Sequence, residues 1–270
     1  MRSVGFKRHR FFRRASGVRV LSASEHKFPA ERRSTRSATS TPSIRTIKTW
    51  DLGVRLFHWL LVASVALAFL SSEEESALSA WHVPAGWVAA VLIAFRLVWG
   101  IVGGEHARFS NLIRPSRMKG HVRGLFVGRV HASLGHNPLG GVAVLALLAL
   151  TAATVFTGVA GGEESHEIIA WALLAMIALH VVAVVAMSFL TRDNLIGAMI
   201  TGRKKTTHFP DAQDAAPPAR LAVPLAVLVV AGSAYAATRI DPTAFTPGAK
   251  AEAGEGSEGE EMEAYEADED

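Results

Sequence analysis

The sequence of 270 residues contains no cysteine. This absence excludes disulfide bonds, iron–sulfur clusters, thiolate ligands to a haem iron and covalently attached haem. Any haem that binds must therefore be held non-covalently, through histidine or methionine. Residues 1–45 also lack a long apolar run, although they are basic. This segment is therefore not expected to form a secretory signal.

Aspartate and glutamate are absent from five apolar blocks, while half of all residues are hydrophobic and the mean hydropathy is +0.25. Four blocks approach the ~20 residues that a helix needs to cross the hydrocarbon core, and the fifth is shorter and contains Pro224 and Gly232. Because lipid offers no hydrogen bonds, each span must be helical. The sequence thus predicts an all-α integral membrane protein, with a four-helix transmembrane bundle and a fifth, C-terminal transmembrane helix. The blocks are Val54–Leu70, Val83–Val102, Leu139–Ala160, Ile168–Leu190 and Leu221–Ala237.

Lysine and arginine are absent from the segments 71–80 and 161–165, which carry glutamates. They are concentrated in residues 1–50, with thirteen basic against two acidic residues, and in the segments after the second and fourth blocks. By the positive-inside rule, this pattern predicts a cytoplasmic N-terminus, alternating spans and a periplasmic C-terminus. Because the charge alternates in step with the spans, nucleic-acid binding is not expected despite the pI of 9.7.

Composition divides the chain into five parts. A basic N-terminal arm (1–45) precedes a helical domain (46–207), a linker (208–220), the fifth span (221–237) and an acidic tail (238–270). Ten of the last nineteen residues are acidic, a composition typical of disorder. Both ends are expected to be solvated appendages. The alternative is that the tail attracts a basic soluble partner and the arm binds anionic lipid headgroups.

Two histidines, His166 and His180, lie fourteen positions apart in one apolar segment. Fourteen helical residues advance about 21 Å and turn about 1400°, within about 40° of four whole turns. Both imidazoles are therefore predicted on one helix face, near opposite sides of an apolar core about 30 Å thick. The first two spans each offer one more histidine, His58 and His82, at opposite depths.

Depth pairs His58 with His180 near the inner side of the membrane, and His82 with His166 near the outer side. Each pair provides two imidazoles, the usual axial ligands of a low-spin haem that transfers electrons. Polar residues at membrane depth are costly, so they are functional candidates by default. Taken singly, His82 and His166 lie near helix ends, where a histidine is more often an interfacial polar residue. His58 and His180 lie deeper, and each is as readily a ligand as a polar residue of the interface. Four histidines that pair by depth favour two haems, one above the other.

Arg96 follows His82 by fourteen positions and so shares its predicted helix face. A buried guanidinium there can neutralise haem propionates or a quinone headgroup, or the side chain can snorkel to the interface. Gly86, one turn after His82, leaves room for a flat macrocycle or serves as a helix-packing contact. The other histidines are expected on the cytoplasmic surface, with His136 as an alternative ligand. They are His9, His26, His106, His121, His131, His136 and His208.

The motifs around these residues resemble the bacterial cytochrome b561 family. This family belongs to a larger group of four-helix di-haem cytochromes that includes hydrogenase cytochrome b subunits. The resemblance covers about residues 46–207, and the long arm and the fifth helix with its acidic tail depart from the family pattern. The matching stretches are WDLGVRLFHW (50–59), HVPAGW (82–87), RLVWGIVGGEHARFSN (96–111), GHNPLGG (135–141), ESHEIIAW (164–171), LHV (179–181) and NLIGAMITGRK (194–204).

The resemblance implies two b-type haems per chain, ligated by His58, His82, His166 and His180 in the pairing argued from depth. It implies quinone or quinol as a redox partner, with a c-type cytochrome or a dehydrogenase subunit as further candidates. It also implies a place in the bacterial inner membrane and its respiratory chain. Membrane lipid is a further expected partner, and a homodimer is one option.

These observations predict a membrane electron carrier between the quinone pool and a partner. In one version it is the relay of a dehydrogenase or hydrogenase. In the other it is a free-standing, quinol-linked oxidoreductase that acts on superoxide or a soluble cytochrome. The alternative is a haem-free transporter whose histidines handle protons or metal ions. A transporter of that kind would need acidic residues inside the spans, and a purely structural anchor would not need histidines at matched depths.

Overall fold

The structure, a computed structural model, describes residues 45–73, 75–112 and 133–248. The predictions for the basic arm, for most of the acidic tail and for His9, His26, His121 and His131 fall outside these residues. Within the described ranges, five helices are long and apolar enough to cross a membrane, which confirms the predicted spans. They are α1 (Leu52–Leu70), α2 (His82–Val102), α5 (Pro138–Val159), α6 (Glu163–Thr191) and α8 (Ala222–Ile240).

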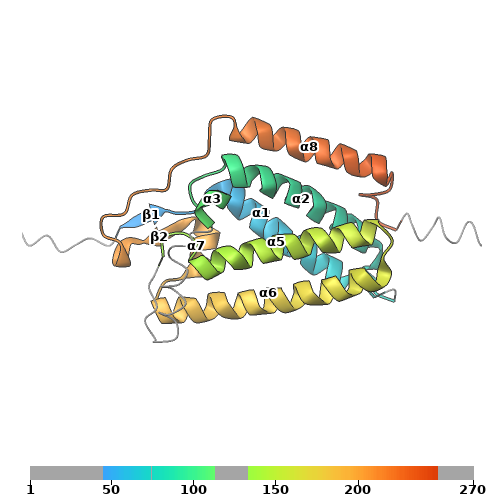
Figure 1. Ribbon diagram of the computed structural model, residues 1–270, viewed down its shortest axis with the longest axis horizontal. Coiled ribbons are helices and arrows are strands. Elements are labelled where there is room, and N and C mark those ends of the chain that lie inside the picture. Colours follow the sequence, from blue (N-terminus) through green and yellow to red (C-terminus); the bar gives the residue numbers. More distant parts are fainter. Residues whose placement is uncertain (1–44, 74, 113–132, 249–270) are drawn as a thin grey trace, which may run out of the picture. The chain divides into compact units, whose positions relative to one another are not determined.

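Shorter elements join and flank these helices. They are β1 (Thr46–Lys48), η1 (Ser79–Trp81), α3 (Phe109–Leu112), α7 (Leu195–Thr201), β2 (Arg203–Lys205) and η2 (Thr206–His208). The strands β1 and β2 pair antiparallel, with Ile47 opposite Lys204, beside the start of α1 and the end of α6 (Figure 1). We call this the ribbon end of the bundle. The opposite end, where the connections 71–81 and 160–162 lie, is the loop end.

Polar caps determine where two of the spans begin. The Asp51 side chain accepts a hydrogen bond from the backbone N–H of Val54 (2.9 Å), and Asn137 accepts one from Gly140 (2.6 Å). Each cap satisfies one of the N–H groups that the first helical turn leaves unpaired. Pro138, which has no N–H to satisfy, occupies the first position of α5. These side chains therefore fix the starts of α1 and α5 at the ribbon end.

The closest backbone packing joins α8 to α2, α2 to α1 and α5, and α5 to α6 (Figure 1). Small side chains allow α8 to approach, because Ala222 and Ala226 are buried beside Trp50 and Trp99. At the loop end, Trp87 packs against Ala237 and Ala244 in a second cluster. The fifth helix is therefore an integral part of the bundle.

The ribbon end is tied together by hydrogen bonds between distant segments. The Gly202 carbonyl accepts from the backbone N–H groups of Thr49 (2.8 Å) and Trp50 (3.1 Å). Gly202 has φ of +77°, a backbone conformation that favours glycine. Lys204, which is 4% exposed, pairs with Asp193 at 3.0 Å. These contacts fix the entry to α1 against the segment that follows α6.

Large apolar side chains point outward along the spans. Phe189, Ile101 and Phe156 are each more than 70% exposed. In water such a surface would be unfavourable, whereas in a bilayer it meets hydrocarbon. The outward faces of the helices therefore fit a lipid environment.

Candidate functional site

His82 and His166 come together at the loop end. His82 is the first residue of α2, and His166 lies in the first turn of α6. Their ring centroids are 6.0 Å apart and the rings are inclined by 74°. Metal–imidazole bonds of about 2.0–2.1 Å, with a ring radius added on each side, put the centroids of two rings that share one metal roughly 6 Å apart. The observed separation therefore fits one metal held between the two rings.

Hydrogen bonds fix the proton position on both rings. His82 Nδ1 lies 2.9 Å from the Ala68 carbonyl of α1, and His166 Nδ1 lies 2.9 Å from the Thr154 carbonyl of α5. Because a carbonyl only accepts, Nδ1 is the donor in each ring, and in the neutral form of the ring the lone pair is on Nε2. This arrangement is the one that orients a histidine for binding a metal through Nε2.

His58 and His180 form the second predicted pair, on α1 and α6 towards the ribbon end. Both side chains are half-buried, and the two rings interact electrostatically. No ring contact joins them within the described part of the chain. His58 Nδ1 is buried, and among the described residues it has no hydrogen-bond partner. A buried polar nitrogen without a partner costs about 1–3 kcal/mol.

The helices that carry each histidine pair are not close packing neighbours. In the described ranges, α6 packs its backbone closely on α5 and α7, and neither α1 nor α2 is among its close neighbours. Yet the ring of His166 on α6 lies beside the ring of His82 on α2. The loop-end pair therefore joins two helices that are not close packing neighbours.

Arg96 is buried at the level of the ribbon-end pair, with 3% of its surface exposed. Its Nη2 donates to the Ala107 carbonyl (3.0 Å), and its guanidinium lies 4.6 Å from the centre of the Phe109 ring. Its Nη1 is buried and has no partner among the described residues. The side chain therefore does not snorkel to the interface, and its buried Nη1 lacks an acceptor among the described residues.

His136 is not the surface residue that the sequence predicted. Its ring packs edge-on against Trp50, with 4.7 Å between centroids, and His106 lies against the same tryptophan at 6.0 Å. Both histidines are half-buried. The turn before α5 folds back beneath the ribbon end, because Lys204 donates to the Ser133 carbonyl (3.0 Å). This return half-buries a segment whose polar composition is typical of an exposed loop.

The environment of His136 opposes its protonation. Burial lowers the pKa of His136 to about 3, and the nearby charges of Arg96 and Lys204 and the neighbouring His180 act in the same direction. Desolvation and like charge both disfavour the imidazolium form. The ring is therefore neutral at physiological pH, as a metal ligand or a hydrogen-bond acceptor must be.

Gly86 leaves open space beside the loop-end pair. A Cβ atom built at Gly86 would meet no atom within 4 Å, although Ala85 and Trp87 on either side of it are buried. The predicted helix-packing contact at this glycine is therefore absent among the described residues. Room for a flat group remains one turn from His82.

Sequence reasoning missed the part played by Asp51. Besides capping α1, its carboxylate accepts from Trp99 Nε1 (2.9 Å) and from the backbone N–H of Gly104 (3.0 Å). It thereby connects the start of α1, which carries His58, to the end of α2, which carries Arg96. Its position directly before an apolar block was a signal for the cap, but nothing in the sequence indicated the partners on α2.

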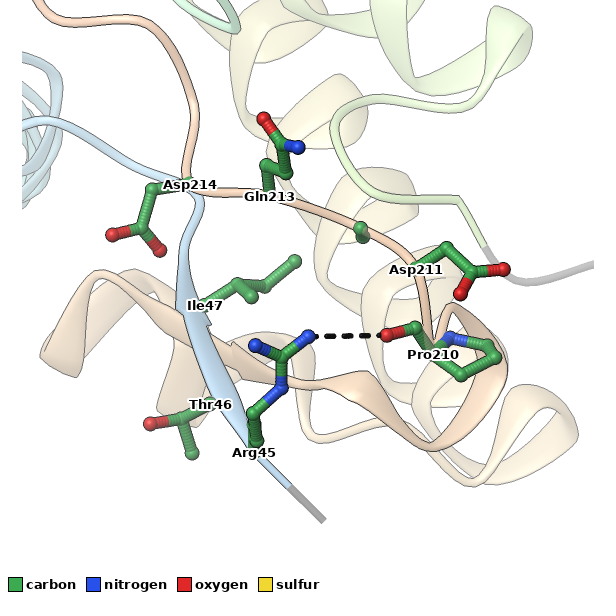
Figure 2. A pocket seen from close by; sticks show the side chains of 8 residues that line it. Arg45, Thr46, Ile47, Pro210, Asp211, Gln213 and Asp214 are labelled. Carbon is green, nitrogen blue, oxygen red and sulfur yellow. Dashed lines mark hydrogen bonds between the residues drawn. The ribbon is translucent and has the colours of Figure 1, made fainter. Parts of the chain in front are cut away.

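One surface hollow lies away from the histidines, between β1 and the segment after η2 (Figure 2). Arg45 spans it and donates to the Pro210 carbonyl (3.3 Å), with Ile47 and Asp214 on its walls. Within the described ranges, no cluster of three or more His, Asp or Glu side chains is arranged to hold a metal ion. Among the histidines of the spans, His82 and His166 lie ring against ring.

Comparison with known proteins identifies a family. A family model described as prokaryotic cytochrome b561 matches residues 49–202, which include all four histidines and Arg96. No curated protein and no solved structure is significantly similar to the chain. The matched segment begins next to the Asp51 cap and ends at Gly202, so it leaves α8 outside.

Proposed function

The chain belongs to the prokaryotic cytochrome b561 family, and from this premise we propose that it is a di-haem electron carrier between the quinone pool and a redox partner. Membership of the family makes it a membrane b-type cytochrome of electron transfer. The proposal adds the number of haems, their ligands and the partners. The observation that carries it is the loop-end pair, in which His82 and His166 stand 6.0 Å apart with both Nδ1 atoms engaged.

Four histidines hold the two haems in this proposal. His82 and His166 bind one iron through Nε2, while the carbonyls of Ala68 and Thr154 keep the rings oriented. His58 and His180 bind the other iron towards the ribbon end. A b-type haem with two imidazole ligands has no open position for oxygen, and so it supplies one-electron transfer.

Arg96 has a charge-neutralising part in this arrangement. Its buried Nη1 lacks an acceptor among the described residues, and a haem propionate or a quinone oxygen would supply one. Phe109 and the Ala107 carbonyl hold the guanidinium in place. The side chain therefore offers a fixed positive charge at the level of His58.

The orientation follows from the charge distribution. The ribbon end adjoins the basic segments, and the loop-end connections 71–80 and 161–165 carry no Lys or Arg. By the positive-inside rule the ribbon end lies in the cytoplasm of a bacterial cell and the loop end in the periplasm. The N-terminus is then cytoplasmic. Because α8 begins at the ribbon end and crosses the membrane, the C-terminus lies in the periplasm.

The partners proposed are quinone or quinol within the membrane, and a c-type cytochrome or a dehydrogenase subunit. A second version is a free-standing oxidoreductase that couples quinone to superoxide, and a homodimer is compatible with either. A stable complex with a dehydrogenase that survives detergent extraction favours the first version. Quinone-dependent turnover by the isolated protein favours the second.

The decisive experiment is a reduced-minus-oxidised spectrum of the detergent-solubilised protein, with haem per chain measured as the pyridine haemochrome. Two haems with low-spin b-type bands are expected. His82→Ala and His166→Ala should each remove the same haem, and His58→Ala and His180→Ala the other. His26→Ala, in the N-terminal arm, is the control that should retain both.

Other outcomes contradict specific parts of the proposal. A single haem per chain in the unaltered protein would show that one of the two histidine pairs does not bind haem. Absence of haem from protein produced with ample haem supply would overturn it, and would favour the haem-free proton or metal-ion transporter.

A further inference from the structure

A polar side chain is buried in the apolar half of α1 that lies nearer the loop end. The buried residues of α1 are Val54, Phe57 and Ser64, and Ser64 alone of these three lies in that half. It is 6% exposed. Because polar side chains at membrane depth are costly, a buried one is a functional candidate. The function proposed above gives Ser64 no part.

The Ser64 hydroxyl joins α1 to α2. Its Oγ donates to the Ala85 carbonyl at 2.6 Å. A hydroxyl inside a helix can instead bond to a carbonyl of its own preceding turn, as Thr151 of α5 does with Leu147 (2.8 Å). Hydroxyls that bond across helices help to hold membrane bundles together. Ser64 therefore ties α1 to α2 at the level of Ala85.

A second hydrogen bond joins the same two helices about one turn nearer the loop end. His82 Nδ1 of α2 donates to the Ala68 carbonyl of α1 (2.9 Å). Ala68 follows Ser64 by four positions on α1. His82 precedes Ala85 by three positions on α2, so both bonds lie along one seam between the helices.

We propose that Ser64 is a positioning residue, which sets the register of α1 against α2 so that the Ala68 carbonyl meets Nδ1 of the haem ligand His82. This inference rests on the proposed function. Ser64 acts through the backbone of α1, and the Ala68 carbonyl transmits the effect to the imidazole. A partner on the second ring nitrogen fixes the orientation of a histidine ligand.

The end of α1 makes the Ala68 carbonyl available. The last four carbonyls of a helix have no partner within the helix. Three of them accept from serines: Leu67 from Ser71, Phe69 from Ser72, and Leu70 from Ser76. Ala68 accepts from His82 Nδ1 and, at 3.2 Å, from the Ser71 hydroxyl. The acceptor of His82 is therefore fixed to α1, and its position depends on where α1 lies against α2.

Packing beside Ala85 does not replace the Ser64 bond. A Cβ built at Gly86, the next residue of α2, meets no atom within 4 Å. Without the bond, α1 is free to shift along the seam, and the Ala68 carbonyl shifts with it. The His82 ring then turns away from the orientation at which it is inclined by 74° to the ring of His166.

Electron paramagnetic resonance of the ferric loop-end haem tests this role, because the largest g value of a haem with two imidazole ligands depends on the angle between their planes. The His180→Ala background retains the loop-end haem alone and leaves α1 unaltered. In that background Ser64→Ala should shift the largest g value. It should also speed the transfer of the haem to apomyoglobin by about three- to tenfold. Ser64→Thr, which keeps a hydroxyl, should retain the original spectrum.

The matched control is Thr151→Val in the same background. Thr151 is 4% exposed, so this variant also removes a buried hydroxyl, but one that bonds within its own helix. The spectrum and the transfer rate should both stay unchanged. Three outcomes overturn the inference and leave the proposed function intact: an unchanged spectrum in Ser64→Ala, an equal shift in Thr151→Val, or a spectrum of Ser64→Thr that matches that of Ser64→Ala.

If the unaltered protein binds no haem at the loop end, the proposed function fails, and the tautomer of His82 decides whether Ser64 positions its ring. Nitrogen-15 spectra of histidine-labelled protein report the tautomer, and His82→Ala identifies the signal. The unaltered chain should carry the proton on Nδ1, and Ser64→Ala should show a mixture of tautomers. The same tautomer in both chains overturns the inference.

Discussion

At the scale of single residues, a substitution at Gly86 tests whether a haem lies beside His82. No atom of the described residues lies within 4 Å of a Cβ built at Gly86, so a larger side chain fits there when no haem is bound. We expect Gly86→Val to lower the content of the loop-end haem by half or more, because the macrocycle and the new side chain need the same space. Haem per chain and the redox titration of the remaining haem measure the effect.

Gly232→Val is the matched control for this change. Gly232 also has no atom within 4 Å of a built Cβ, but it lies on α8, whose sequence carries no histidine. Both variants carry the same helix-propensity cost of a β-branched residue. Equal haem content in the two variants would show that no macrocycle occupies the space at Gly86.

His136 makes the protein sensitive to acid. Its pKa in the folded protein, about 3, is below the ordinary value of 6.5, so the unfolded chain binds the proton first. The stability that the neutral ring contributes is complete above about pH 6.5 and decreases as the pH falls towards 3. Thermal unfolding between pH 7 and 4 should therefore show a falling melting temperature. His136→Asn, which carries no titrating ring, should show a smaller fall, and identical pH profiles would contradict this role.

The candidate residues were predictable from the sequence because helical periodicity is local. His166 and His180 share α6, and His82 and Arg96 share α2, so spacing alone gives their faces. The burial of His136 was not predictable. It depends on Lys204 and Ser133, about seventy positions apart, meeting at the ribbon end. The polar composition of the segment around His136 is typical of an exposed loop, and it therefore predicts the wrong exposure.

At the scale of elements, α8 depends on small side chains for its place on α2. Ala226 is 5% exposed and lies in the cluster with Trp50 and Trp99. Ala226→Leu should destabilise the protein by about 1–3 kcal/mol through overpacking. Ala231→Leu, at an exposed position of the same helix, should be close to neutral. Thermal unfolding in one detergent compares the two, and equal stabilities would contradict the packing of α8 against α2.

The long elements followed from hydropathy, and the short ones did not. Each predicted span corresponds to a helix because hydrophobic length is a property of one segment. The ribbon of β1 and β2 has three residues in each strand, and its partners lie more than 150 positions apart. Such short strands show no alternating pattern, so their pairing depends on the assembled bundle. The hydrogen bond between Asp51 and Trp99 also depends on the assembled bundle, so the sequence did not predict it.

At the scale of the whole molecule, the lack of cysteine makes the orientation directly measurable. Ser72 lies in the loop-end connection and Thr207 lies at the ribbon end, so each position can receive a single introduced cysteine. In intact cells a membrane-impermeant maleimide should label Ser72→Cys, while Thr207→Cys should react only after permeabilisation. The opposite pattern would invert the orientation, and the unaltered chain is a label-free control.

The two levels of histidines on α6 carry an electrical consequence. His166 and His180 are fourteen positions apart along one continuous helix, about 21 Å by helical rise. In the proposed di-haem arrangement, an electron that moves from one level to the other travels through a large part of the insulating layer. Moving one charge across the full layer involves about 2.3 kcal/mol per 100 mV. Under that proposal the distribution of an electron between the two levels depends on the membrane voltage, so the protein would store charge across the bilayer as well as conduct electrons.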